Sequence, residues 1–569
     1  MRRKIRTTLF SVVSSVLLFS SFCLYLSSEV ISSKKIPPSP VTLRNRSNNH
    51  HNLSFVIREE HHHCSRHVSS IRNLPSLDSI LLPDWEVLLA LSPEIPLSSD
   101  PGDGYSCLFQ NNATSPAKPA GILPFRELTT FKCILPYSVR RLRPFFRPIL
   151  IKSPLNWPGK EPEVPKMFRW GFLVYESLST ENDVILFVKG VNNRQGFNRP
   201  PTELRCVFGN PVFNSIKTDV ISSSQEVFRC LRPNGTALHR FLLAGDVRIK
   251  VSLEIVEERK AVLVPSVAYY TPTRNVATRE KKTLLCACTM VYNVAKFLKE
   301  WVIYHSRIGV EKFILYDNGS DDDLEKVVEE LLEKYNVKTF IWPWPKTQEA
   351  GFSHCAMYAT NSCTWMMYID VDEFIFSPSW LNSSHPSIHM LKSFLPKITH
   401  TSSSSRPPIG QVSIRCFDFG PSNQRSHPIK GVTQGYTCRR RLEQRHKSIV
   451  LLEAIDTSLL NVIHHFQLKE GYKVKKLSRK EGVVNHYKYQ AWPEFRAKFR
   501  RRVSAYVADW RKEVNPRSKD RTPGLGFSPI EPKRWSRKFC EVNDNRVKVV
   551  TRRWFGLDSP AGYKMAWQR

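Results

Sequence analysis

The chain has 569 residues, which is too long for one hydrophobic core, so a single-domain protein is excluded and two folded domains with extensions are expected. Hydrophobic residues make up 41% and charged residues 24%, which is ordinary for a globular protein. The formal net charge of +33 is not ordinary. It favours polyanionic partners: nucleic acid, anionic membrane, acidic polysaccharide or nucleotide phosphate.

The N-terminus predicts a membrane anchor. Residues 1–8 form a basic tail, and no charge occurs between Thr7 and Ser28. About 20 helical residues span roughly 30 Å of hydrocarbon, so residues 9–28 are long enough to cross a bilayer. The basic tail would stay cytosolic, and the rest of the chain would enter the secretory lumen. A cleaved signal peptide is the alternative, with the same consequence for the bulk of the chain. Nucleic acid is therefore not expected as a partner.

Residues 29–73 are rich in Ser, Asn, Pro and His and read as a flexible stem. Residues 74–280 alternate short apolar runs with Pro, Gly and Asn, which predicts a β-sandwich-like domain. This domain is either a structural spacer or a carbohydrate-binding module. In the second case Trp157, Trp170 and Tyr175 would supply flat faces for sugars, although buried core aromatics are the commoner use of such residues.

The cysteines are spread out and show no paired metal-ligand spacing. Cys107 with Cys133, and Cys206 with Cys230, could form disulfides in an oxidising lumen. Cys286 and Cys288 alternate on a predicted buried strand, where apolar packing is the expected role.

The pattern changes at Lys281, where residues 281–510 alternate strands and helices. This alternation predicts an α/β domain with a parallel sheet, and ligands bind beyond the carboxyl ends of such strands. Tyr292–Asn293, Asp317–Asp323 and Asp370–Glu373 all fall at those ends. Residues 511–569 form a basic extension with no clear core pattern. The expected strands are Leu284–Met290, Lys312–Tyr316, Val337–Ile341 and Trp365–Ile369, and the expected helices are Val294–Ile308, Leu324–Tyr335 and Phe352–Asn361.

Three carboxylates, Asp370, Asp372 and Glu373, lie between two apolar runs at the end of the fourth strand. Carboxylates this close repel one another unless a cation lies between them, and Mn²⁺ or Mg²⁺ with oxygen ligands and phosphate is the usual solution. The two-residue period of a strand predicts that Asp370 and Asp372 share a face, while Glu373 joins them or supports them. A solvated acidic turn is the plainer alternative, and the flanking apolar runs disfavour it.

Further residues are candidates for the same site. His486 and His464 could be additional metal ligands. Arg441 and Lys447, in a basic run, could neutralise phosphates, or the run could be a solvated face. Asp317 and Asn318 suit either donor binding or turn formation. A catalytic base requires one more carboxylate; Glu453 and Asp456 are the candidates, and Asp418 and Glu443 are not excluded.

The motifs around these residues resemble a known family. The stretches Thr289–Asp322, Trp365–Phe376, His446–Phe466 and Val483–Trp492 resemble plant glycosyltransferase family 92, which is similar to the galactan synthases. The resemblance implies a GT-A fold, a nucleotide-sugar donor, a divalent metal and inverting transfer in the Golgi lumen. It assigns the DxD pattern to Asp370 and Asp372, and the donor-loop pattern to Asn293, Asp317 and Asn318. In related galactan synthases a β-sandwich carbohydrate-binding domain precedes the catalytic domain.

We therefore expect a type II Golgi membrane enzyme with a lumenal catalytic domain. It would move a hexose, by analogy galactose, from a UDP-sugar to a cell-wall polysaccharide or glycan, with acidic pectin favoured by the basic charge. A second copy of the chain is a further candidate partner. The alternative from another functional class is a non-catalytic lumenal lectin or scaffold that binds acidic polysaccharide.

Overall fold

The structure is a computed structural model that describes six stretches of the chain. Within these stretches no helix is long and apolar enough to span a membrane. The predicted tail, the anchor and the stem up to residue 72 lie outside the described residues. The stretches are 73–91, 104–152, 165–271, 281–396, 407–498 and 524–568, with short gaps at 75, 124–127, 193–196, 211–213, 236–247, 258–260, 463, 526–527 and 561.

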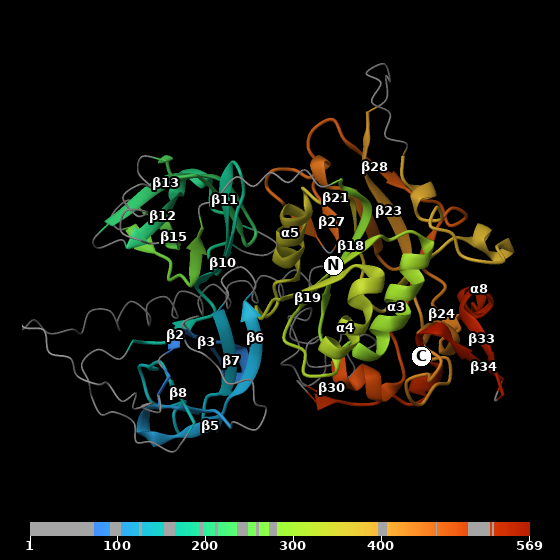
Figure 1. Ribbon diagram of the computed structural model, residues 1–569, viewed down its shortest axis with the longest axis horizontal. Helices are drawn as coiled ribbons and strands as arrows, with labels where there is room; N and C mark the ends of the chain where they lie inside the picture. The colour runs from blue at the N-terminus through green and yellow to red at the C-terminus, as the bar shows by residue number, and fades with distance from the viewer. Residues whose placement is uncertain are drawn as a thin grey trace, which may run out of the picture. The chain divides into compact units, whose positions relative to one another are not determined.

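The first half of the described chain consists of strands, as its sequence predicts. Three sheets have the strand orders β1-β8-β4-β5, β6-β7-β3-β2-β9 and β10-β11-β14-β13-β12-β15-β16, with β17 beside β15 (Figure 1). Within these sheets the strand pairs are antiparallel except β2 with β9. The strands are β1 (Asn73–Leu74), β2 (Ser76–Leu81), β3 (Glu86–Leu91), β4 (Ser106–Leu108), β5 (Thr114–Pro116), β6 (Lys118–Leu123), β7 (Leu128–Ile134), β8 (Ile149–Ile151), β9 (Phe168–Arg169), β10 (Leu173–Ser179), β11 (Asp183–Lys189), β12 (Leu204–Asn210), β13 (Asn214–Ser224), β14 (Val227–Leu231), β15 (Ile249–Val256), β16 (Ala261–Leu263) and β17 (Ala268–Tyr270).

Two separate cores hold this β-rich region together. The first contains Leu89 of β3 and Leu150 of β8, and the disulfide Cys107–Cys133 connects β4 to β7 across it. The second contains residues of β10 to β17, and the disulfide Cys206–Cys230 connects β12 to β14. Both disulfides expected from the sequence are present.

A fourth, mixed sheet forms the centre of the remaining described chain. Its order is β20-β19-β18-β21-β25-β23-β29-β22, with β28 beside β23. Strands β18 to β21 are parallel, as predicted, but β25 runs antiparallel to β21 and β22 antiparallel to β29. The expectation of a parallel sheet therefore holds for the first four strands, whereas the rest of the sheet mixes antiparallel pairs with the parallel pairs of β23 with β28 and β29. The strands are β18 (Thr283–Val291), β19 (Lys312–Asp317), β20 (Val337–Ile341), β21 (Cys363–Tyr368), β22 (Glu373–Phe376), β23 (Ile409–Asp418), β25 (His446–Leu451), β28 (Lys473–Lys476) and β29 (Val483–His486).

Helices cover both faces of this sheet. Helices α3 (Ala295–Ile308) and α4 (Leu324–Tyr335) share one core with alternate residues of β18, β19 and β21, and α5 (Gln348–Ala359) packs on the intervening residues (Figure 1). Helix α5 begins at Gln348, before the expected Phe352. The sequence pattern missed the start because the helix is buried on most sides and therefore carries no amphipathic stripe. Cys286 and Cys288 do more than pack: they form disulfides with Cys363 and Cys355.

The β-rich region contributes side chains to the core on the α5 face. The indoles of Trp170 and Trp344 stack with ring centroids 5.8 Å apart, and the ring of Tyr175 lies 5.4 Å from that of Trp344. Trp170 is 6% exposed and Tyr175 is 0% exposed, so neither offers a face to a sugar. The sugar-stacking interpretation is wrong for these two residues, while Trp157 lies outside the described residues.

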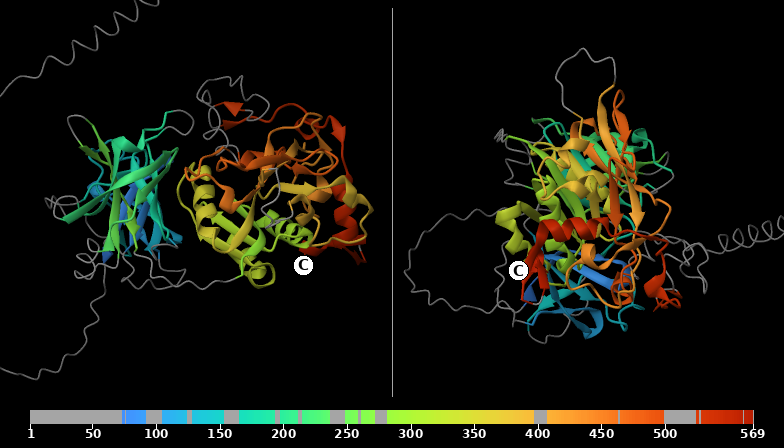
Figure 2. Two further views of the ribbon diagram at one scale, coloured as in Figure 1. Left: turned by 90° about the horizontal axis from the view of Figure 1, so that it is seen from above. Right: turned by 90° about the vertical axis from the view of Figure 1, so that its right-hand side faces the viewer.

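The C-terminal segment is part of the α/β domain, contrary to the expectation of an extension without a core. Helix α8 (Arg546–Phe555) places Val547, Val550 and Phe555 in the same core as α3, and Cys540 is bonded to Cys438 (Figures 1 and 2). Strand β32 (Val542–Asn543) also pairs with β24 (Cys438–Arg439). The remaining short elements are α6 (Val432–Gly435), β26 (Asn461–Val462), β27 (His465–Phe466), β30 (Gly524–Leu525), β31 (Ser528–Pro529), β33 (Gly556–Ser559), β34 (Gly562–Met565) and a helical stretch at 492–498.

Candidate active site

The three carboxylates lie on a tight turn between β21 and β22. Strand β21 ends at Tyr368, and the backbone N–H of Glu373 donates to the carbonyl oxygen of Asp370 at 3.0 Å. The carboxylate of Glu373 in turn accepts from the backbone N–H of Asp370 at 3.0 Å. Asp370 and Asp372 therefore meet because the chain turns, and not because they share a strand face as expected. Carboxylate oxygens of all three residues lie within 4.8 Å of one another.

The predicted convergence of the strand ends is confirmed by the register of the sheet. Asp317 at the end of β19 pairs with Val291 at the end of β18. On the other side of β18, Cys288 pairs with Tyr368 of β21. The loops that follow these strands are also bonded to each other. The Nδ2 of Asn293 donates to Asp321 at 2.5 Å, and its Oδ1 accepts from the backbone N–H of Asp321 at 2.9 Å.

Lys447 of β25 lies beneath the acidic turn and is only 5% exposed. Its ammonium is 2.6 Å from Glu373 Oε1, 3.2 Å from Asp370 Oδ2 and 2.7 Å from His464 Nε2. Burial by itself would lower the pKa of Lys447, but the charges of Asp370 and Glu373 outweigh burial and raise it. Lys447 thus balances the buried carboxylates, and the expectation that it contacts donor phosphates is corrected.

The same cation keeps Asp370 ionised. Burial would raise the pKa of Asp370, but Lys447 and His464 lower it well below its ordinary range. Gln348, the first residue of α5, donates to Asp370 Oδ1 at 3.2 Å. The side chain of Asp370 is 31% exposed, so an ionised carboxylate faces outward from a buried cluster of charges.

His486, at the end of β29, lies on the other side of the turn, as its candidacy for the metal site requires. Its Nδ1 is 3.1 Å from Asp418 Oδ1, and its Nε2 is 3.6 Å from Asp372 Oδ1. Burial would raise the pKa of Asp418, but His486 and Lys488 lower it below its ordinary range. With Nδ1 beside Asp418, the other ring nitrogen, Nε2, faces Asp372, which is the arrangement of metal-binding histidines supported by a carboxylate.

His464 lies deeper than His486. It is 1% exposed, its ring packs against Phe352 at 5.2 Å, and its Nε2 is 3.5 Å from Asp370 Oδ2. Because the same nitrogen is close to the Lys447 ammonium, the geometry favours a role in holding Asp370 over direct metal binding. Its assignment as a metal ligand stays a prediction.

The loop after β19 serves mainly to shape the site. Asp317 Oδ1 accepts from the backbone N–H of Ser320 at 2.9 Å and from its hydroxyl at 2.7 Å, and burial raises the pKa of Asp317. Asn318 Nδ2 donates to the carbonyl oxygens of Trp342 at 2.6 Å and Trp344 at 3.1 Å. Both residues therefore form turns. Tyr292, beside Asn293, is half-buried at the same sheet edge.

Three other candidates are not brought to the acidic turn. Arg441 is exposed, and its backbone N–H donates to Glu541 at 2.9 Å. Glu453 and Asp456 follow Leu451, which pairs with Trp365 at the start of β21. At about 3.3 Å per residue, Asp370 is roughly 16 Å further along that strand, so neither carboxylate can act as base there. The antiparallel direction of β25, which the sequence does not reveal, is the reason.

The donor set fits a hard divalent cation. Asp370 and Asp372 offer carboxylate oxygens, and His486 offers an imidazole nitrogen with a carboxylate behind it; these are ligands that Mn²⁺ accepts. Sequence analysis missed Gln348, Lys498 and the support role of Asp418. Lys498 Nζ is 3.5 Å from Asp372 Oδ2. No local pattern marks these residues, since each is distant from the turn along the chain.

An α/β sheet with an acidic turn after its fourth strand fits the glycosyltransferase class of enzymes, while the GT-A type stays a prediction. A family model, Glycosyltransferase family 92, matches residues 281–521. A family 92 protein of Ricinus communis is 39% identical over 515 residues, which cover 88% of this chain and 86% of that protein. Family 92 proteins of rice and Arabidopsis thaliana are 42% and 41% identical, over 68% and 74% of this chain and 67% and 72% of their own lengths. The chain belongs to glycosyltransferase family 92, so it is an enzyme and not the lectin considered above.

Solved structures match more distantly. Residues 1–349 of Staphylococcus aureus TarS align with 39% of this chain and 65% of that chain, at 12% identity and a TM-score of 0.21. Glucosyl-3-phosphoglycerate synthase of Mycobacterium tuberculosis, in its complex with Mn²⁺, UDP and glucosyl-3-phosphoglycerate, aligns with 30% of this chain and 58% of that chain, at 13% identity and a TM-score of 0.18.

Proposed function

We propose that the protein is a metal-dependent, inverting glycosyltransferase that uses a UDP-sugar. One observation carries the proposal: Asp370 and Asp372 have carboxylate oxygens within 4.8 Å of each other, His486 Nε2 lies 3.6 Å from Asp372, and buried Lys447 and Asp418 contact Asp370 and His486. A purely structural acidic turn would not need a histidine oriented by a second carboxylate.

The chain's own residues would divide the work. Asp370, Asp372 and Nε2 of His486 would hold the divalent ion, Mn²⁺ or Mg²⁺, which supplies positive charge against the diphosphate leaving group. Lys447 keeps Asp370 ionised, and Asp418 would orient the ring of His486 through its contact with Nδ1. The Asn293–Asp321 bonds keep the two donor loops in register. Asp317 would contact the donor through Oδ2, because the backbone N–H and the hydroxyl of Ser320 donate to Oδ1.

The test is Asp372→Ala in the lumenal portion, assayed by UDP release. We expect a loss of more than about 1000-fold, because the charge that binds and stabilises the leaving group is removed. Asp323→Ala is the matched control, since Asp323 is an exposed carboxylate on the neighbouring loop. The melting temperature of both variants should stay near that of the wild type. Full activity of Asp372→Ala would overturn the proposal.

We propose galactose as the transferred sugar, on the resemblance to galactan synthases, and an acidic pectic glycan as acceptor. The net charge of +33 supports an acidic acceptor. Exposed Arg141 and Arg143 and half-buried Arg140 place guanidinium groups over Tyr137, Phe145 and Trp85, which adds a local basic surface. In a screen of UDP-sugars with pectic and neutral acceptors, UDP-galactose with a pectic acceptor should release the most UDP, and less at high salt. Faster turnover of another donor would reject galactose alone.

We also propose that residues 9–28 anchor the chain in the Golgi membrane with the catalytic domain in the lumen. Five disulfides within the described residues support an oxidising compartment. Protease protection of the catalytic domain in intact Golgi vesicles would test this orientation, and digestion without detergent would reject it.

A further inference from the structure

Several hydrogen bonds join the β-rich region to the catalytic domain, and one of them ends at a buried asparagine. Asn461, the first residue of β26, is 1% exposed, and its Nδ2 donates to the carbonyl oxygen of Glu349 at 2.9 Å and to Ser353 Oγ at 2.9 Å. Its own carbonyl oxygen accepts from Nε2 of Gln225 at 2.9 Å. Gln225 comes from the turn between β13 and β14. A single residue thus connects the first turns of α5 to the β-rich region.

Two segments next to Asn461 contact Asp370: helix α5 and the chain that follows Asn461. The first residue of α5, Gln348, donates to Asp370 Oδ1 at 3.2 Å. Three residues after Asn461 in the chain, His464 adopts a positive φ of 72° and places Nε2 3.5 Å from Asp370 Oδ2. Ser448 of β25 donates to the carbonyl oxygen of His464. Besides Lys447, two segments therefore contact the oxygens of Asp370: α5, to which Asn461 is bonded, and the segment that follows Asn461 in the chain.

The turn that presents Gln225 is itself rigid. Gln225 has a positive φ of 52°, and its backbone N–H donates to Asn198 Oδ1 at 3.1 Å. Its neighbour Glu226 accepts from the Tyr175 hydroxyl at 2.9 Å and from Lys189 Nζ at 2.5 Å. Tyr175 belongs to the aromatic cluster with Trp344 described above. The turn is thus fixed both to its own sheet and to the catalytic domain.

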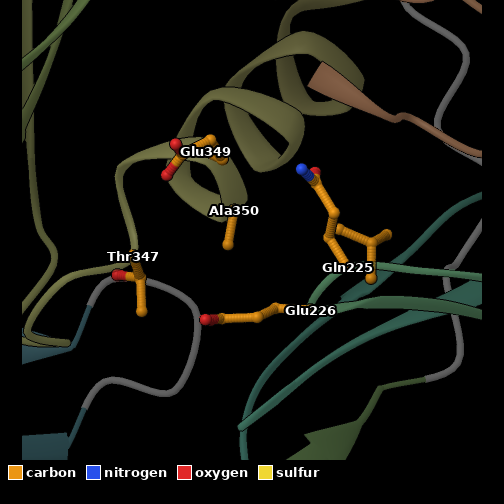
Figure 3. Close-up of a pocket in the computed structure, with 6 residues that line it drawn as sticks. Gln225, Glu226, Thr347, Glu349 and Ala350 are labelled. Atoms are coloured by element: carbon orange, nitrogen blue, oxygen red, sulfur yellow. The ribbon is translucent and has the colours of Figure 1, made fainter. Parts of the chain in front are cut away.

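Figure 3 shows Gln225 and Glu226 on one side of this contact and Thr347, Glu349 and Ala350, at the start of α5, on the other. The space between them leaves about 10 Å³ for the centre of a water molecule, which is the lower limit for one water. The contact is therefore close-packed and has no room for a ligand. A shift of the Gln225 turn must move either α5 or the hairpin that carries His464.

We propose that Asn461 is a positioning residue for Asp370 and that Gln225 holds it in place, so that the β-rich region completes the donor site from a distance. Neither residue touches the reacting groups. The proposal rests on the proposed function, because it assigns Asp370 to metal and donor binding. Its consequence is specific: weakening this connection should lower affinity for metal and donor before it lowers stability.

The experiment compares Gln225→Glu and Asn461→Asp with the wild-type lumenal portion. Both substitutions keep the size of the side chain and remove the N–H donors. The matched control is Asn192→Asp, which removes one buried donor within the β-rich region: Asn192 is 8% exposed, its Nδ2 donates to Ser223 Oγ, and its Oδ1 accepts from the backbone N–H of Arg199. The readouts are binding of Mn²⁺ and UDP by calorimetry, the KM and kcat for UDP-sugar, and the melting temperature.

We expect each test variant to raise the KM for donor and the Kd for Mn²⁺–UDP by about tenfold, the equivalent of one buried hydrogen bond. The control should leave both constants unchanged, even where its melting temperature falls equally. Test variants that melt lower but keep wild-type KM and Kd would overturn the proposal and leave a structural contact only. Loss of activity in Asp372→Ala together with an unchanged Gln225→Glu rejects the positioning role alone, whereas an active Asp372→Ala rejects the function on which it rests.

Discussion

Two buried carboxylates of the catalytic domain face opposite surroundings. Glu300 of α3 is 2% exposed and accepts from the backbone N–H groups of Val432 at 2.7 Å and Thr433 at 3.0 Å and from the Thr433 hydroxyl at 2.5 Å. Glu373 is 0% exposed and lies 2.6 Å from the Lys447 ammonium. One carboxylate is satisfied by neutral donors, and the other belongs to a cluster of opposite charges.

The pKa values of buried carboxylates in these two places differ accordingly. Burial raises the pKa of Glu300 to about 7, and the hydrogen bonds from Thr433 and Val432 only partly oppose this. In the other region burial also acts to raise the pKa of Asp370, but Lys447 and His464 lower it well below its ordinary range. Neutral donors therefore suffice for a carboxylate that fastens a loop, whereas a carboxylate that must stay ionised beside others requires a buried cation.

The largest effect should come from removing that cation. Lys447→Met leaves Asp370 and Glu373 without their buried partner, so we expect a loss of about 3–5 kcal/mol in the free energy of unfolding. Urea denaturation measures it. Lys498→Met is the control, because Lys498 also contacts a site carboxylate but its side chain is 28% exposed, and it should cost about 1 kcal/mol or less. Equal, small effects of the two substitutions would mean that the cluster does not depend on Lys447.

A smaller effect should appear as pH dependence at Glu300. The folded-state pKa of about 7 is above the ordinary 4.5, so the folded protein binds this proton more tightly than the unfolded chain does. The contribution is fully present below pH 4.5 and is lost as the pH rises to about 7, by at most about 3 kcal/mol. Between pH 5 and 7.5 the wild type should therefore lose more stability than Glu300→Gln.

The quantity to compare is the difference in the free energy of unfolding between the wild type and Glu300→Gln at each pH, because histidines also titrate in this range. Glu329→Gln, which changes an exposed glutamate of α4, should follow the wild-type curve. Parallel curves for Glu300→Gln and the wild type would show that Glu300 is not protonated in the folded protein. The two carboxylate surroundings would then differ less than their contacts indicate.

Sequence reasoning reached the acidic turn but not its partners. Asp370, Asp372 and Glu373 are adjacent in the chain and interrupt an apolar run, so local composition reveals them. Lys447, Asp418 and Gln348 reach the turn from β25, β23 and α5. The sequence marks Lys447 only as a member of a basic run that could neutralise phosphates or form a solvated face. Its burial follows from the pairing of β25 with β21, which no local pattern specifies.

The C-terminal segment shows a second limit of sequence reasoning: a helical pattern was present but was not recognised. Val547, Val550, Thr551 and Phe555 are spaced as one face of a helix, and this signal was available in the sequence. It was hidden by the basic residues between them and by the lack of neighbouring periodic elements. Only the packing of α8 into the core of α3 shows that this face is buried.

The sequence by itself determined the α/β half of the catalytic domain, the strands of the β-rich region, the acidic turn and the resemblance to the family. Each of these follows from local periodicity or a contiguous motif, which encodes which side chains are buried within one element. The tertiary structure alone decided the direction of β25, the cation beneath Asp370, the support of His486 and the contact from Gln225. These depend on pairing between segments that are distant in the chain, where the free energy of the whole packed arrangement selects the partner.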